Sequence, residues 1–143
     1  AMEWSKSKYG RESKVIGAVI DLGYCLNLTD YRSADILKQG YIALKESIEI
    51  LGLEMPSNKK GKSKTDILQR DLDCAVIEQI HKLNEYNGKD PYDSVRGVFT
   101  EGNPVYHGAA VLEKTHTKIC IINPNCIKGF FYPMETNEEY RIP

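Results

Sequence analysis

The sequence predicts an α+β fold in which two long helices pack on a mainly antiparallel sheet. Two patterns lead to this expectation: apolar stripes with helical spacing fill the middle of the chain, and short apolar or alternating segments fill its last third. The chain has 143 residues, of which 41% are hydrophobic, so it can bury one core without disulfides or metals. We therefore expect a single domain over residues 1–143.

Extended segments are predicted before the helices. Residues 1–10 read as the last turns of a helix whose beginning is missing. Residues 15–20 form a continuous apolar run rich in β-branched side chains, which is typical of a strand covered on both faces. Gly17 and Ala18 carry little side chain within this run, so another group is expected to pack close to the backbone there. After a bend, a short segment runs through Leu28.

Two amphipathic helices are predicted next. The first covers residues 30–51 and ends at Gly52, and Gly40 weakens its middle by ~1 kcal/mol relative to alanine. The second covers residues 64–86 and starts at a capping box in residues 63–66. The apolar stripes have spacings of three and four residues and consist of Leu37, Tyr41, Leu44, Ile48 and Leu51 in the first helix, and of Leu68, Leu72, Val76, Ile80 and Leu83 in the second.

The last third of the chain is predicted to be rich in strands. Residues 94–99 and 115–122 have strand composition, and residues 127–132 follow a turn at residues 123–125. This spacing predicts that 127–132 return as the hairpin partner of 115–122. The polar residues 134–143 are expected to form a frayed tail.

Composition and charge exclude several classes of function. A net charge of −1 gives no general attraction to nucleic acid or to anionic membranes. The lysines of residues 59–64 are not interleaved with aromatic residues, so nucleic-acid binding is not expected there. No apolar run approaches the ~20 residues of a spanning helix, and no signal peptide is recognisable. We expect a cytoplasmic protein that does not enter the membrane.

The cysteines give no sign of a metal site or of a disulfide framework. No CxxC pair occurs, and no histidine stands at zinc-ligand spacing beside a cysteine. Cys74 falls in a helical pattern and Cys120 in a strand pattern, where a free cysteine serves as a small hydrophobic residue. We expect these two, with Cys25 and Cys126, to be buried and reduced, and we expect no metal.

Residues able to carry chemistry gather in the segment VFTEGNPVYHGAA, residues 98–110. Glu101 stands just past the predicted strand 94–99, where a rigid strand can hold a carboxylate beside a glycine-rich loop that admits a ligand. Such a carboxylate can accept a proton or stabilise positive charge at a breaking glycosidic bond. Arg96 can bind a phosphate or orient Glu101. The same Glu-Gly-Asn-Pro sequence also fits a solvent-facing turn, and this alternative stays open.

Four segments occur in the order found in a known family: VIGAVIDLGYCLNL, DLDCAVIEQIHKL, YDSVRGVFTEGNPVYHGA and HTKICIINPNCIKGFF. Together they resemble the C-terminal two-thirds of a family of uncharacterised bacterial proteins that is similar to ADP-ribosyltransferases. The resemblance implies a split sheet, NAD as substrate, and transfer of ADP-ribose to an unknown acceptor macromolecule. It also implies a fragment, because the Tyr-His-Gly strand and the Tyr-Phe-Trp-Glu segment that open longer members are absent. The chain alone should then bind NAD weakly.

With this resemblance, the predicted site surrounds an NAD cleft. Glu101 and His116 are the predicted catalytic residues, and Arg96, Tyr106 and His107 are the predicted cofactor-binding residues. One departure stands out: in many ADP-ribosyltransferases the catalytic glutamate begins the next strand, where this sequence has no acid. A second hypothesis, from another class, is a non-catalytic protein-interaction or accessory domain, since part of the NAD-binding half is missing and the net charge is near zero.

Overall fold

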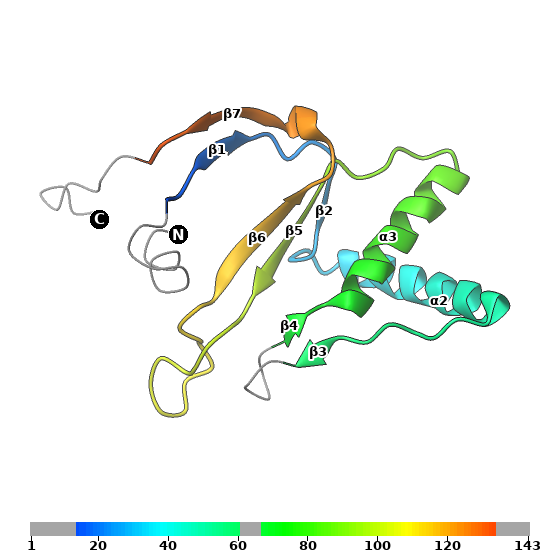
Figure 1. Ribbon diagram of the computed structural model, residues 1–143, viewed down its shortest axis with the longest axis horizontal. Helices are drawn as coiled ribbons and strands as arrows, with labels where there is room; N and C mark the ends of the chain where they lie inside the picture. Colours follow the sequence, from blue (N-terminus) through cyan, green and yellow to red (C-terminus); the bar gives the residue numbers. More distant parts are fainter. Residues whose placement is uncertain (1–13, 61–66, 134–143) are drawn as a thin grey trace, which may run out of the picture. The chain divides into compact units, whose positions relative to one another are not determined.

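The computed structural model describes residues 14–60 and 67–133 (Figure 1). The chain divides into two units. One unit, Leu22–Asn123, contains both helices and a three-stranded sheet, and the other joins the chain ends, Ala1–Asp21 and Pro124–Pro143. Over the described ranges 14–60 and 67–133, two helices with mixed and antiparallel sheets confirm the α+β class. Within the described residues, neither helix combines the length and hydropathy that crossing a membrane requires.

The sheet of the larger unit has the strand order β2 (Cys25–Asn27), β5 (Ser94–Phe99) and β6 (His116–Ile121). β2 runs parallel to β5 and β6 runs antiparallel to it, so this sheet is mixed. Val95 lies beside Leu26 of β2 and opposite Cys120 of β6 in the register. Because side chains alternate along a strand, this register decides which residues of β5 face the helices.

Helix α2 (Ser33–Leu51) begins at Ser33 rather than at residue 30. Of its predicted stripe, Leu37, Leu44 and Ile48 belong to the core, whereas Tyr41 and Leu51 are exposed. The Ser33 hydroxyl donates a hydrogen bond to the carbonyl of Asn27 at 2.7 Å, which ties the start of the helix to the end of β2. The helix ends where Gly52 adopts a left-handed conformation with φ of 63°, as predicted.

Helix α3 (Asp71–Tyr86) is shorter than the predicted 64–86. The prediction was wrong at its start, because Ile67–Gln69 form strand β4, which pairs antiparallel with β3 (Lys59–Lys60). The predicted capping box at residues 63–66 lies outside the described residues. The helical spacing of apolar residues extends back to Leu68, but Leu68 belongs to strand β4 and the helix begins at Asp71.

A distant side chain caps α3. The side-chain oxygen Oδ1 of Asn58 accepts hydrogen bonds from the backbone N–H groups of Leu72 at 3.0 Å and Asp73 at 3.3 Å. The Asn58 amide nitrogen donates to the Asp73 carboxylate at 2.8 Å. Two of the unpaired donors at the helix start are satisfied in this way, so the cap rests on the loop fold rather than on the adjacent sequence.

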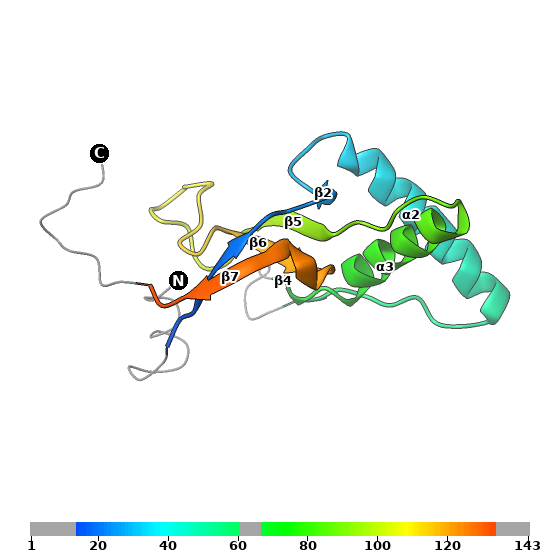
Figure 2. The ribbon, with the colours of Figure 1, turned by 90° about the horizontal axis from the view of Figure 1, so that it is seen from above.

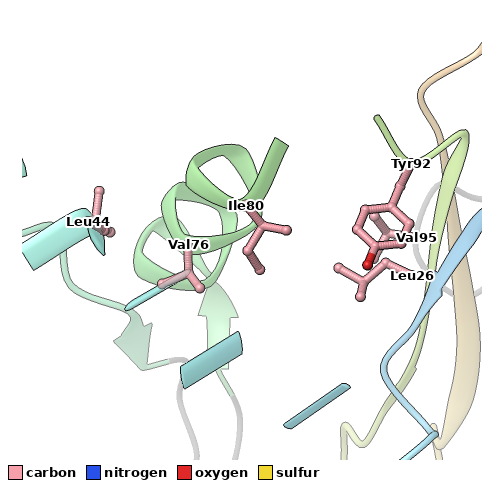
Figure 3. Packing of buried hydrophobic residues seen from close by; sticks show 6 residues of the cluster. All are labelled: Leu26, Leu44, Val76, Ile80, Tyr92 and Val95. Atoms are coloured by element: carbon pink, nitrogen blue, oxygen red, sulfur yellow. The ribbon is translucent and has the colours of Figure 1, made fainter. Parts of the chain in front are cut away.

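The helices and the sheet of the larger unit meet in a small core. Figure 3 shows α3, α2 and the strands each supplying apolar side chains to it, and its buried members are Leu26, Leu44, Val76, Ile80, Tyr92 and Val95. Figure 2 shows α2 and α3 crossing, and Gly40 lies buried at their contact. A Cβ at Gly40 would collide with Cγ1 of Ile80. Gly40 thus permits a close approach between the helices.

Asp93 connects three segments of the larger unit. Its carboxylate accepts hydrogen bonds from the Tyr24 N–H at 2.8 Å and from the Asn123 side-chain amide at 2.7 Å. Its carbonyl accepts from the N–H of Ile122 at 2.9 Å, and its own N–H donates to the Tyr24 carbonyl at 2.8 Å. The Asn123 amide, followed by the Tyr24 N–H, holds the pKa of the Asp93 carboxyl below its usual 3.8.

The smaller unit contains a two-stranded antiparallel pair, β1 (Gly17–Ile20) with β7 (Ile127–Phe131). The predicted hairpin between 115–122 and 127–132 is therefore wrong, because β7 pairs with the first strand of the chain. The Phe131 ring packs directly on Gly17, which confirms the expected close approach to that backbone. Val19 is 57% exposed, so β1 is not covered on both faces as predicted. Residues 1–10 and the predicted tail lie outside the described residues.

Gly40→Ala tests the helix contact. Helix propensity alone would stabilise the variant by ~1 kcal/mol, but overpacking against Ile80 costs typically ~1–3 kcal/mol. We expect the free energy of unfolding, measured by urea denaturation, to fall by ~0–2 kcal/mol, the difference between these two effects. The exposed neighbour change Gln39→Ala should alter it by less than ~0.5 kcal/mol. A Gly40→Ala protein that is more stable than the unchanged chain would contradict the close contact.

Asp93→Asn tests the role of the carboxylate. Because the folded-state pKa of Asp93 is lowered, its contribution to stability is present above pH 3.8 and is lost as the pH falls through that lower pKa. We expect Asp93→Asn to lower Tm at neutral pH, with the difference from the unchanged chain shrinking below pH 3.8. The exposed Asp90→Asn serves as the control. A Tm difference that stays constant with pH would argue against the carboxylate.

Candidate functional site

Glu101 stands two residues after Phe99, the last residue of β5, and its side chain is held by an ion pair. Its Oε1 accepts a hydrogen bond from Nζ of Lys118 on β6 at 3.2 Å. The Glu101 side chain is 17% exposed, whereas that of Lys118 is 50% exposed. The Glu101 carbonyl also accepts the N–H of Lys114 at 3.0 Å. A largely covered, ion-paired carboxylate is thus placed at the end of the central strand.

Phe99 is the centre of the groups around Glu101. The Arg70 guanidinium lies 4.4 Å from the Phe99 ring centroid, and the Lys118 ammonium lies 4.7 Å from it. The His116 ring stacks on Phe99 at 6.3 Å with an interplanar angle of 26°. The Nδ1 of His116 is 2.6 Å from the Lys114 carbonyl, so Nδ1 carries a proton and donates it. Cations on an aromatic face are attracted by the ring quadrupole.

A groove runs over the helix-facing side of the sheet. Its larger part has a volume of ≈ 1400 Å³ and is lined by residues of α3, β5 and β6, including Lys118. Its smaller part, of ≈ 940 Å³, reaches α2 and includes Arg70. Phe99 lines both parts. The walls are mainly apolar, but charged residues also line them: Arg70 and Lys118 lie beside Phe99, and Glu78, Lys82 and Glu85 of α3 line the larger part.

Arg96, Tyr106 and His107 are not brought to this groove. Arg96 stands three residues before Phe99 on β5, so the two side chains lie on opposite faces of the sheet. The cation that pairs with Glu101 is Lys118. Tyr106 is 69% exposed and His107 is also exposed. Both stand in the loop between β5 and β6, and neither lines the groove. Glu101 and His116 do not line the groove either, but each contacts a residue that does: Glu101 pairs with Lys118, and His116 stacks on Phe99.

His81 of α3 lies in the wall of the larger part of the groove. Its Nε2 is buried and has no hydrogen-bond partner among the described residues. Its ring meets Tyr92 edge-on with centroids 5.8 Å apart. Burial lowers the pKa of His81 below its usual 6.5. Its place beside the apolar stripe of α3 was the sequence signal that could have indicated this wall.

The cysteine prediction is correct for one residue and wrong for two. Cys126 is buried, Cys25 is half-buried, and Cys74 and Cys120 are exposed. Cys74 and Cys120 line the larger part of the groove from α3 and β6. Desolvation, with the negative charges of Asp73 and other acids added to it, raises the pKa of the Cys74 thiol, so Cys74 is not an activated nucleophile. In the part of the chain that the structure describes, no cluster of three or more metal-binding side chains occurs.

Comparisons of the chain with protein-family models, with curated proteins and with solved structures give no match. The similarity to ADP-ribosyltransferases therefore stays a prediction from the sequence segments. The geometry adds an aromatic centre, Phe99, with its neighbouring ions, which the sequence segments do not single out.

His81→Gln tests whether the buried imidazole titrates. Since burial lowers its folded-state pKa, stability is complete above pH 6.5 and is lost as the pH falls below 6.5 toward that lower pKa. Unfolding free energies measured from pH ~7.5 to ~5.5 should decline less steeply for His81→Gln than for the unchanged chain. The exposed His107→Gln should keep the original slope. Equal slopes in all three proteins would exclude a buried neutral His81.

Proposed function

We propose that the chain belongs to an ADP-ribosyltransferase-like protein that transfers ADP-ribose from NAD to an unknown acceptor. Glu101 would stabilise the positive charge that develops on the ribose. The observation that carries the proposal is the Glu101–Lys118 pair: a carboxylate that is 17% exposed is held at 3.2 Å by a lysine that lines the groove. A carboxylate fixed in this way needs little reorganisation when positive charge develops beside it.

The proposed reaction breaks the bond between C1′ of the ribose and the nicotinamide nitrogen, and the electron pair of that bond leaves with nicotinamide. An oxygen or nitrogen atom of the acceptor then bonds to C1′, and the proton that this atom loses passes to Glu101 or to water. Glu101 acts by electrostatics at C1′ while the cation exists. His116 is close enough to share this environment through its stacking on Phe99.

The size and composition of the groove support a dinucleotide as the ligand. Small-molecule pockets typically have volumes of ~300–1,000 Å³, and the larger part of this groove exceeds that range at ≈ 1400 Å³. Arg70 and Lys118 offer positive charge for a diphosphate, and the apolar walls of the groove offer surface for a nicotinamide or adenine ring. We assign the phosphate contact to Arg70 and Lys118 instead of Arg96.

A second candidate function is a non-catalytic protein-interaction domain. Two observations favour it: the groove walls are mainly apolar, and Lys118 already neutralises the charge of Glu101. An interaction domain would bind an apolar segment of a partner without any response to NAD. Calorimetric titration with NAD therefore separates the two candidates.

Glu101→Gln tests the enzymatic proposal. We expect release of nicotinamide from NAD to fall by ~10²-fold or more, because removing one preorganised electrostatic group costs about that factor. Where the gene encodes residues before Ala1, the assay uses that longer chain. Glu113→Gln, which removes an exposed carboxylate from the same loop, should leave the rate unchanged.

Thermal unfolding checks that Glu101→Gln stays folded, since a partly exposed ion pair contributes only ~0–1 kcal/mol. An unchanged rate in Glu101→Gln would remove Glu101 from the mechanism. Absence of nicotinamide release from every variant, with no heat of NAD binding, would favour the interaction domain.

A further inference from the structure

Strand β6 is an edge strand of the larger unit. It is six residues long and pairs with β5 on one side. Among the described residues, no strand pairs with its other side. Residues 117–120 are exposed, and Ile119 is 42% exposed. An exposed strand edge presents free N–H and C=O groups to any extended segment that can match them.

The register shows which residues of β6 direct their backbone groups outward. The Arg96 carbonyl accepts the N–H of Leu28, so Arg96 turns its backbone groups toward β2. The neighbouring residues Val95 and Gly97 must then bond to β6, where they face Cys120 and Lys118. The hydrogen bond from the Ile122 N–H to the Asp93 carbonyl follows the same alternation, because Ile122 stands two residues after Cys120. The outward groups on β6 consequently belong to Thr117, Ile119 and Ile121.

We propose that β6 pairs antiparallel with β6 of a second copy of the chain, about a two-fold axis through Ile119. This register places Ile119 opposite Ile119 of the second copy and Thr117 opposite its Ile121. All three outward-bonding residues take part, which gives about six hydrogen bonds between the strands. The facing side chains are β-branched and uncharged, the type that packs best across neighbouring strands.

The neighbouring registers fit less well, so two copies are expected to pair in the Ile119 register. An axis through Lys118 would set two lysines directly opposite each other, which is unfavourable. An axis through Cys120 would leave Thr117 without a partner among the outward-bonding residues. In the Ile119 register, Lys118 lies beside Cys120 of the second copy. The ion pair of Lys118 with Glu101 keeps its charge satisfied within its own chain.

The pairing also affects the groove. Lys118, Ile119 and Cys120 of β6 line its larger part. A two-fold axis perpendicular to the sheet keeps the helix-facing sides of both sheets on the same side. The second copy would therefore extend the sheet at the open side of the groove and bring its own Lys118 next to Cys120. This inference stands independently of the reaction proposed above.

Variants at the axis test the pairing. Sedimentation equilibrium of the unchanged chain should show a dimer at tens to hundreds of micromolar. Ile119→Lys and Ile119→Asp should each raise the dimer Kd by ~10-fold or more, because each places like charges opposite themselves. An equimolar mixture of the two should dimerise again. Val98→Lys changes an exposed residue of the middle strand and should leave the Kd unchanged.

Amide hydrogen exchange tests the same pairing without a variant. The N–H groups of Thr117, Ile119 and Ile121 should exchange more slowly as the protein concentration rises. Those of Lys118 and Cys120 bond to β5 and should show no concentration dependence. The proposal would be overturned if the unchanged chain stays monomeric over this concentration range, or if the variants associate as it does. It would also be overturned if the folded Lys and Asp variants fail to associate when mixed. Outward amides that exchange at concentration-independent rates would overturn it as well.

Discussion

The hydrogen bonds of Asp93 fix how the strands of the larger unit line up. One residue holds the backbone of Tyr24 before β2, stands immediately before β5, and binds Ile122 and Asn123 after β6. Three strands that are far apart in the sequence are thereby clamped at one end in a single register. A shift by one residue would turn every side chain of a strand to the opposite face.

This register determines the chemistry of the candidate site. It turns Phe99 and Lys118 toward the helices and Arg96 away from them. Glu101 follows Phe99 by two residues and meets Lys118 across the strand pair, so its cationic partner is chosen by strand alignment rather than by distance along the chain. The same alternation leaves Ile119 on the outer edge with its backbone groups unpaired by β5.

The spacing of apolar residues predicted where the helices and strands lie better than it predicted which strands pair. Helix α2 and the strand 94–99 were found as expected, because each depends on local spacing, although the outer stripe residues Tyr41 and Leu51 are exposed. The start of α3 was missed because its cap, Asn58, comes from a distant loop. The pairing of β7 with β1 was missed because hairpin spacing says nothing about a strand at the other end of the chain. The predicted roles of Glu101 and His116 stay predictions, and the contact of Arg70 with Phe99 depends on three-dimensional contacts that no local spacing shows.

The contact between Gly40 and Ile80 carries a consequence for how this sequence can change over time. The space between the helices is a fixed volume shared by two positions, so a larger side chain at one is tolerated only with a smaller one at the other. In any lineage that keeps this helix crossing, the two positions should therefore covary in size. A gain at position 40 would have to follow, or accompany, a loss at position 80.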